Sequence, residues 1–235
     1  MLRYALAAAR ATQHDTAARI EGRFLYNGCM IALIDYGAGN LKSVANACAA
    51  IGADIEITTD PAVIRRATSI ILPGVGAFAE GMDRLRKAGL LPVLNEEVIE
   101  KKKPYLGICL GLQFLAEVSE EHGTHEGFGW IRGTVKKLTP RDPACKVPHI
   151  GWNTISVVKD SPLLTGVKPT VEFYFLHSFQ LVCSDNSDVV ATTEYGESIT
   201  AVIQHGNIFA TQFHPEKSQD SGLKILENFM AWNPT

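Results

Sequence analysis

The chain lacks the features that most readily assign a protein to a class. Positive and negative side chains nearly balance, with a formal net charge of −3, so no basic surface for nucleic acid is expected. No apolar run approaches the length of a membrane span. The five cysteines have neither metal-binding nor disulfide spacing, so we expect no metal site and free thiols in a reducing compartment. They are Cys29, Cys48, Cys109, Cys145 and Cys183.

The composition is that of a globular protein with an unusual beginning. With 46% hydrophobic and 20% charged residues, the 235 positions suit one large α/β domain, or a domain with a long insertion. Residues 1–18 are rich in Ala and Arg and resemble a weak transit segment. Residues 20–23, however, spell a protease recognition site used in fusion proteins. A fusion remnant or an upstream translation start is therefore equally plausible. We predict a loosely ordered extension over 1–29 and a domain over 30–235. The expected location is cytoplasmic, or organellar if 1–29 is a genuine transit peptide.

The stretch from Tyr105 to Gln113 predicts a cysteine nucleophile in a sharp turn. An apolar strand, 105–108, runs directly into Cys109, and a helix is expected over 110–118. Gly107 and Gly111 flank the cysteine at the spacing that a sharp strand–nucleophile–helix turn needs. A helix N-terminus also favours a thiolate. A buried cysteine in a glycine-containing turn is the alternative, so a base elsewhere in the chain is required.

The candidate base is His214, which follows an apolar run over 207–213. Glu216, two residues further on, can orient the imidazole, and Pro215 restricts the backbone between them. A histidine beside an acid is usually a surface pair. Together with an elbow cysteine, the pair favours nucleophilic catalysis.

Two glycine-containing loops follow predicted strands. The loop at 36–40 lacks the full Gly-x-Gly-x-x-Gly pattern, so we expect neither a nucleotide nor any other cofactor. The loop Pro73-Gly74-Val75-Gly76 is either a simple tight turn or a source of N–H groups for a developing oxyanion.

Hydrophobic periodicity predicts an α/β fold. Strands at 30–35, 54–58 and 69–72 alternate with helices at 41–51 and 61–67. Two further helices fill 78–103. They end in a run of lysines at 101–103, which we interpret as a solvated helix terminus. After 118 the pattern becomes β-rich and partly antiparallel. Runs are expected at 130–138, 152–158, 171–176, 189–193, and in a hairpin, 200–204 with 208–213, before a closing helix over 222–232.

The motifs in register resemble those of the triad (class I) glutamine amidotransferases, and more finely the family of glutaminase subunits of imidazole glycerol phosphate synthase. The resemblance spans about 30–232. It implies a class I glutamine amidotransferase-like fold, with a mostly parallel central sheet flanked by helices and an added antiparallel β-rich portion. The motifs that carry it lie at 34–40, 73–76, 107–111, 148–153, 173–179 and 214–218.

The resemblance also implies residue roles. Cys109, His214 and Glu216 would form the catalytic triad that hydrolyses L-glutamine to glutamate and ammonia, with the N–H groups of Val75 and Leu110 holding the oxyanion. The residues implied to hold glutamine are Gly76, Gln113, Glu121, Ser178 and Phe179. Without the family, Gln113 reads equally well as a polar residue on a helix face, and Glu121 would read as a surface charge.

The implied partner is the (β/α)8-barrel cyclase subunit of the synthase, in a heterodimer that makes imidazole glycerol phosphate and an aminoimidazole carboxamide ribonucleotide in L-histidine biosynthesis. Asn40, Trp152, Tyr174 and Lys217 match positions near that interface, and for Trp152 ordinary packing is an equal explanation. Two alternatives stay open. The chain could serve another synthase or act as a free cysteine amidase, or it could be a catalytically silent binding subunit.

Overall fold

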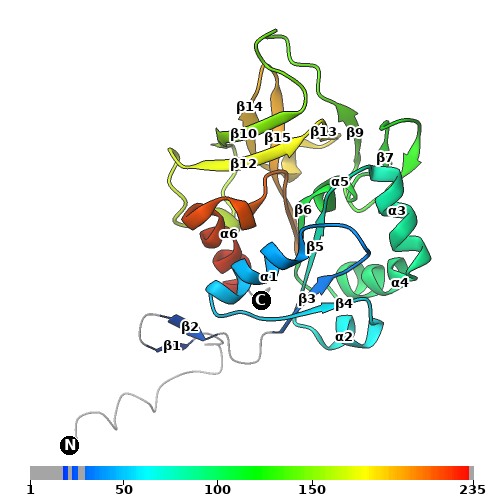
Figure 1. Ribbon diagram of the computed structural model, residues 1–235, viewed down its shortest axis with the longest axis vertical. Coiled ribbons are helices and arrows are strands. Elements are labelled where there is room, and N and C mark those ends of the chain that lie inside the picture. The colour runs from blue at the N-terminus through cyan, green and yellow to red at the C-terminus, as the bar shows by residue number, and fades with distance from the viewer. Residues whose placement is uncertain (1–17, 21–22, 26–29, 233–235) are drawn as a thin grey trace, which may run out of the picture.

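Five parallel strands form the centre of the protein in a computed structural model, which describes residues 18–20, 23–25 and 30–232. Their order is β16-β6-β5-β3-β4, and antiparallel β15, β14 and β11 extend the sheet beyond β16. In Figure 1, β3, β4, β5 and β6 are labelled below β14 and β15. The strands of this sheet are β3 (Met30–Ile34), β4 (Asp54–Thr58), β5 (Ser69–Gly74), β6 (Tyr105–Cys109), β11 (Ser156–Val157), β14 (Val189–Glu194), β15 (Ser198–His205) and β16 (Ile208–Thr211).

Helices cover both faces of this sheet. Ala32 and Ile34 of β3 enter the core that contains α3 and α4, whereas Ile31 and Leu33 of the same strand enter the core that contains α1 and α6. All four side chains are fully buried, as expected of a parallel strand between two helical layers. The helices and helical turns are α1 (Leu41–Ala50), α2 (Pro61–Arg66), α3 (Phe78–Lys87), α4 (Leu90–Asn95), the π-helical turn η1 (Glu96–Glu100), α5 (Leu110–Gln113), η2 (Pro162–Leu164), η3 (Asn186–Asp188), η4 (Pro215–Lys217) and α6 (Gln219–Ala231).

The β-rich portion divides between the main sheet and two smaller sheets. One small sheet has the order β13-β9-β7-β8, and the other is the antiparallel pair β10–β12. Their strands are β7 (Val118–Ser119), β8 (His125–Glu126), β9 (Gly133–Lys137), β10 (His149–Thr154), β12 (Glu172–His177) and β13 (Phe179–Cys183). The predicted fold class is confirmed, although the sequence analysis missed strand β13.

The helix predicted over 110–118 is wrong in length, because α5 ends at Gln113. The reason is tertiary. The carbonyl oxygens of Phe114, Leu115 and Ala116 accept hydrogen bonds from Phe128, Ile131 and Gly129 respectively, all in the loop before β9. The apolar run is therefore buried as an irregular segment, because its carbonyl groups bond to a distant loop instead of to the next helical turn.

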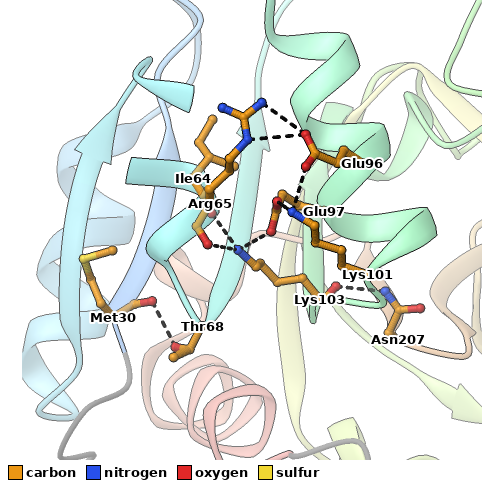
Figure 2. Close-up of polar contacts among 9 residues, drawn as sticks. All are labelled: Met30, Ile64, Arg65, Thr68, Glu96, Glu97, Lys101, Lys103 and Asn207. Atoms are coloured by element: carbon orange, nitrogen blue, oxygen red, sulfur yellow. Dashed lines mark hydrogen bonds and ion pairs between the residues drawn. The ribbon is translucent and has the colours of Figure 1, made fainter. Parts of the chain in front are cut away.

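Figure 2 shows an ion-pair cluster where the helical stretch before β6 ends. The carboxylate of Glu97, almost fully buried, lies 2.6 Å from Lys103 Nζ and 2.7 Å from Lys101 Nζ. Burial by itself raises the pKa of Glu97, but the hydrogen bonds from the two lysines outweigh it and hold the pKa below its usual range. Asn207 donates to the carbonyl oxygen of Lys103, and this bond links the residue before β16 to the segment before β6. The solvated terminus expected for the lysine run therefore fits Lys101 but not Lys103.

Most of the N-terminal extension lies outside the described residues. The expectation that it is loosely ordered therefore falls on residues that the structure does not describe. Within it, β1 (Ala18–Ile20) and β2 (Arg23–Leu25) pair as a short antiparallel ladder apart from the main sheet. The boundary between 1–29 and 30–235 stays a prediction.

Candidate active site

Three adjacent parallel strands end at one edge of the main sheet, and a candidate site residue follows or ends each of them. In the strand register Gly74 of β5 pairs with Cys109 of β6, and Ile108 pairs with Thr211 of β16. His214 comes three positions after Thr211. Parallel strands present their carboxyl ends at the same edge, so the sheet order itself brings the sulfur and the imidazole together.

Cys109 adopts a backbone conformation that side chains other than glycine rarely take, with φ +56° and ψ −104°. The flanking glycines permit this sharp turn. A Cβ on Gly107 would lie 2.5 Å from the carbonyl oxygen of Gly111, and a Cβ on Gly111 would lie 1.9 Å from the carbonyl oxygen of Leu72. Backbone strain of this kind is maintained where the surrounding fold holds it, and here it allows Cys109 to end β6 and lead directly into α5 while lining a pocket.

His214 and Glu216 form a buried pair beside this turn. The distance from His214 Nδ1 to Glu216 Oε1 is 2.9 Å, and their side chains are 2% and 1% exposed. The backbone N–H of His214 donates to the carbonyl oxygen of Tyr174 (2.9 Å), and its own carbonyl oxygen accepts from the hydroxyl of Ser218 (2.6 Å). The imidazole is therefore held at both its ring and its backbone.

The electrostatics of His214 favour an imidazolium. Burial by itself lowers its pKa, but the neighbouring Cys109, and then Glu216, raise it to about 10. Nδ1 bonds to Glu216, whereas Nε2 is buried and has no hydrogen-bond partner among the described residues, so Nε2 is the nitrogen left to act on the sulfur. A positively charged imidazole beside the sulfur is the environment in which cysteines act as thiolate nucleophiles.

A pocket of about 240 Å³ opens beside Cys109. This volume lies below the range typical of sites for drug-sized ligands and suits a molecule of amino-acid size. The oxyanion and glutamine-binding candidates all line it, together with three residues to which no role was assigned. The full lining is Val75, Gly76, Cys109, Leu110, Gln113, Glu121, Pro148, Leu176, His177, Ser178 and Phe179.

Two of the lining side chains are fixed by hydrogen bonds. Gln113 donates from Nε2 to the carbonyl oxygen of Phe179 at 2.9 Å. Glu121 accepts the backbone N–H of Phe78 at 2.7 Å, and so caps the start of α3, whose own N-cap residue makes no side-chain bond. The pocket wall is therefore braced against both β13 and α3.

A larger open hollow of about 820 Å³ lies next to β13, β14 and β15, but none of the candidate site residues lines it. It combines aliphatic side chains such as Val158 and Val182 with neutral polar groups and with the charged residues Lys159 and Glu197. Because the strained cysteine lines the smaller pocket, the candidate chemistry belongs there, although His214 and Glu216 are buried and do not themselves line it.

Three of the four candidate interface residues lie in a row outside the pocket. Trp152 and Tyr174 are paired across β10 and β12, with ring centroids 5.9 Å apart, and Lys217 Nζ lies 5.6 Å from the centroid of the Tyr174 ring. Trp152 is 44% exposed and Ile150, two positions before it on β10, is 56% exposed. Asn40, the fourth candidate, stands at the start of α1, and its side chain makes no capping bond there.

Sequence reasoning gave no role to two buried histidines next to the pocket. His177 Nδ1 bonds to the carbonyl oxygen of Phe179 (2.9 Å), so it carries a proton and Nε2 is the acceptor for His149 Nδ1 (3.0 Å). Burial lowers the pKa of His149 to about 4 and that of His177 to about 3, so both are neutral at neutral pH. The pair forms a directional chain that holds the backbone beside Ser178. Both histidines lie within motifs that the sequence analysis singled out, but their contact depends on the pairing of β10 with β12.

The described residues include no group of three or more His, Cys, Asp or Glu placed to hold a metal ion. In the same part of the chain no helix is both long and apolar enough to cross a membrane.

Comparison of the sequence with known proteins identifies the family of the chain. The sequence model of the family described as glutamine amidotransferase class-I matches residues 32–232. The chain belongs to the class I glutamine amidotransferases.

The relatives of this amidotransferase narrow the assignment. It is 50% identical over 209 residues to the imidazole glycerol phosphate synthase subunit HisH of Zymomonas mobilis, a match that covers 87% of this chain and 96% of the relative. It is 45% identical over 209 residues to subunit HisH 2 of Nitrobacter winogradskyi, covering 87% and 99%. At these identities, this amidotransferase belongs with the HisH subunits.

Solved structures support the fold alone. PurLQS from Thermotoga maritima has a TM-score of 0.65 at 18% identity, covering 86% of this amidotransferase and 97% of that chain. A glutamine amidotransferase from the same organism has a TM-score of 0.59 at 17% identity, covering 86% and 82%.

Proposed function

We propose that this chain is the glutaminase subunit of an imidazole glycerol phosphate synthase, which hydrolyses L-glutamine and passes ammonia to a cyclase in histidine biosynthesis. The observation that carries the proposal is the strained Cys109 beside the buried His214–Glu216 pair. The identity to HisH subunits over nearly their whole length specifies which glutaminase it is. The scattered cysteines favour a reducing compartment, and we place the protein in the cytoplasm unless residues 1–29 act as a transit peptide.

The catalytic steps follow from which group carries the proton at each stage. The Cys109 thiolate attacks the side-chain carbonyl carbon of glutamine, and the tetrahedral oxyanion is held by the N–H groups of Val75 and Leu110. His214, already protonated, gives its Nε2 proton to the departing ammonia, and Glu216 keeps the ring oriented. The neutral imidazole then takes a proton from water, which hydrolyses the thioester and releases glutamate.

Glutamine fits the pocket through its amino-acid end. Gly76, Gln113, Glu121, Ser178 and Phe179 line the pocket and would hold the α-amino and α-carboxylate groups. Phe179, at the start of β13, would contribute its backbone N–H, because its carbonyl oxygen already accepts from Gln113 and His177. One oxygen of Glu121 is occupied by α3, so its second oxygen remains for the substrate's α-ammonium.

The ammonia must reach the cyclase without being protonated in bulk water, so a partner must cover the site. The row of Trp152, Tyr174 and Lys217, with Ile150 beside it, has the mixed aromatic and basic character of an interface. Trp152 and Ile150 are exposed, and Tyr174 and Lys217 are half-buried. We propose that a (β/α)8-barrel cyclase subunit docks there and around Asn40. It would use the ammonia to make imidazole glycerol phosphate and the aminoimidazole carboxamide ribonucleotide.

We also propose that the isolated subunit is slow. Gly76 has φ +99° and nothing within 4 Å of a Cβ position, so the backbone at 75–76 has room to turn its N–H groups toward or away from the pocket. Gly74, in contrast, ends β5 and packs closely against Tyr36 and Leu110. Docking of the cyclase and its ligand would favour the arrangement that serves the oxyanion.

Glutamate release measured with and without the cyclase tests the proposal. Activity should rise on adding the cyclase and vanish in Cys109→Ala, and activity that survives this substitution would refute the assigned nucleophile. Complementation of a strain lacking the histidine-pathway glutaminase separates this function from service to another synthase. A thiol-reactive glutamine analogue that fails to label Cys109 in the complex would indicate a silent binding subunit.

A further inference from the structure

A buried glutamine contacts the candidate nucleophile from the neighbouring strand. Gln212 follows β16 directly, is fully buried, and places Nε2 3.7 Å from the sulfur of Cys109. Its backbone N–H donates to the carbonyl oxygen of Ala201 on β15, so the residue is held by the sheet. Gln212 does not line the pocket, and it approaches the sulfur from the interior of the protein.

The orientation of this side-chain amide is determined by its neighbours. Nε2 of Gln113 donates to the carbonyl oxygen of Phe179, which can only accept, so the identity of that atom is certain on chemical grounds. The same Nε2 lies 3.2 Å from Gln212 Oε1. If the Gln212 amide were reversed, two NH₂ groups would face each other. Its oxygen therefore faces Gln113 and its N–H faces Cys109.

The sulfur has contacts that respond in opposite ways to loss of its proton. The carbonyl oxygen of Leu176, 3.7 Å away, can accept an S–H but offers nothing to a thiolate. The N–H of Gln212 becomes a stronger donor contact when the sulfur is charged, because hydrogen bonds to ionised groups are about twice as strong as those between neutral groups. Gln212 is thus a neutral group that favours the thiolate independently of the histidine.

We propose that Gln212 is a catalytic residue, which donates its side-chain N–H to the sulfur of Cys109 to stabilise and aim the thiolate, with Gln113 bracing its amide. The inference rests on the proposed role of Cys109 as nucleophile and adds a donor that neither the motifs nor the family comparison assigned. Since the contact is with the sulfur and not with the pocket, its loss changes kcat and leaves KM for glutamine nearly unaltered.

The test follows the thiolate directly. Gln212→Met keeps side-chain length and removes the donor. The rate at which iodoacetamide alkylates Cys109 is measured against pH in the full chain, with the Cys109 peptide quantified by mass spectrometry so that the other cysteines do not interfere. A lost hydrogen bond to a charged group should raise the midpoint of this profile by about one pH unit and lower kcat of the complex about tenfold.

Gln180→Met is the matched control, because Gln180 is also a buried glutamine but bonds to Glu197 and the backbone of Thr200. It should alkylate with the wild-type midpoint. A folded Gln212→Met protein that also keeps the wild-type midpoint would overturn the proposal, as would a rise in KM with unchanged kcat.

If Gln212→Met does not fold, nuclear magnetic resonance of the wild-type chain labelled with ¹⁵N-glutamine decides the question. One glutamine side-chain amide, distinct from that of Gln113, should shift as Cys109 titrates and should not shift in Cys109→Ala. No such amide would contradict the contact. Because alkylation and resonance need neither glutamine nor the cyclase, they read the contact even if the glutaminase assay fails.

Discussion

Replacing Glu216 with glutamine removes one negative charge from the candidate triad while keeping the size of the side chain. The contact with His214 is 2.9 Å and both side chains are almost fully buried, so solvent screens the pair little. A hydrogen bond to a charged group contributes about 1.5–3 kcal/mol, or about one to two pKa units. Coulomb attraction at about 4 Å and an effective dielectric constant of about 20 sets a ceiling of about 4 kcal/mol, or about three units.

The direction of the shift follows from which form the carboxylate favours. Glu216 stabilises the imidazolium, so its loss lowers the pKa of His214 from about 10. Cys109 raises that pKa more than Glu216 does, so we expect a fall of about one to two units instead of the ceiling value. The protonated imidazole is then lost at lower pH, and the alkaline limb of kcat against pH moves down by the same amount.

The assay is glutamate release by the complex between about pH 6 and 10, with Asp220→Asn as the control. Asp220 is an exposed carboxylate four positions after Glu216, so its substitution removes the same charge without touching His214. In Glu216→Gln we also expect kcat near pH 8 to fall at least about 100-fold, because proton transfer needs the oriented ring. An alkaline limb at the wild-type position, with activity within about threefold of wild type, would refute the assigned role of the pair.

Three further outcomes are expected. Gly111→Ala places a Cβ 1.9 Å from the carbonyl oxygen of Leu72, so the elbow cannot form and thermal unfolding should show strong destabilisation. Gly129→Ala, at φ +67° but with open space at its Cβ, should lose only about 1–2 kcal/mol, the cost of a left-handed alanine, and keep the site. Lys103→Met leaves the buried Glu97 with Lys101 as its remaining partner and should lower the free energy of unfolding by about 3 kcal/mol in urea titrations. Trp152→Ala should weaken cyclase binding at least tenfold, as measured by calorimetry, and leave the slow activity of the isolated subunit unchanged; equal affinity would exclude Trp152 from the interface.

Much of the architecture was predictable because it depends on local patterns. The strand–helix alternation, the glycines around Cys109 and the short spacing from His214 to Glu216 each lie within a few residues, where backbone geometry and side-chain period act. The same reasoning failed at α5, because the apolar run after Gln113 has helical periodicity but its carbonyl groups bond to a loop more than ten residues away. It also missed β13, whose pairing with β9 joins segments that are distant in the chain.

The amino-acid sequence by itself determined the α/β class, the order of the motifs and the elbow around the cysteine, since these follow from periodicity and from which residues tolerate a strained turn. Only the tertiary structure decided that β16 lies beside β6, and hence that Gln212 and Cys109, 103 positions apart, touch. The burial of Lys103 against Glu97 and the histidine chain behind the pocket were decided in the same way. Their cause is packing between strands and helices that meet only when the whole sheet has formed, and no local pattern encodes which distant side chain will be the neighbour.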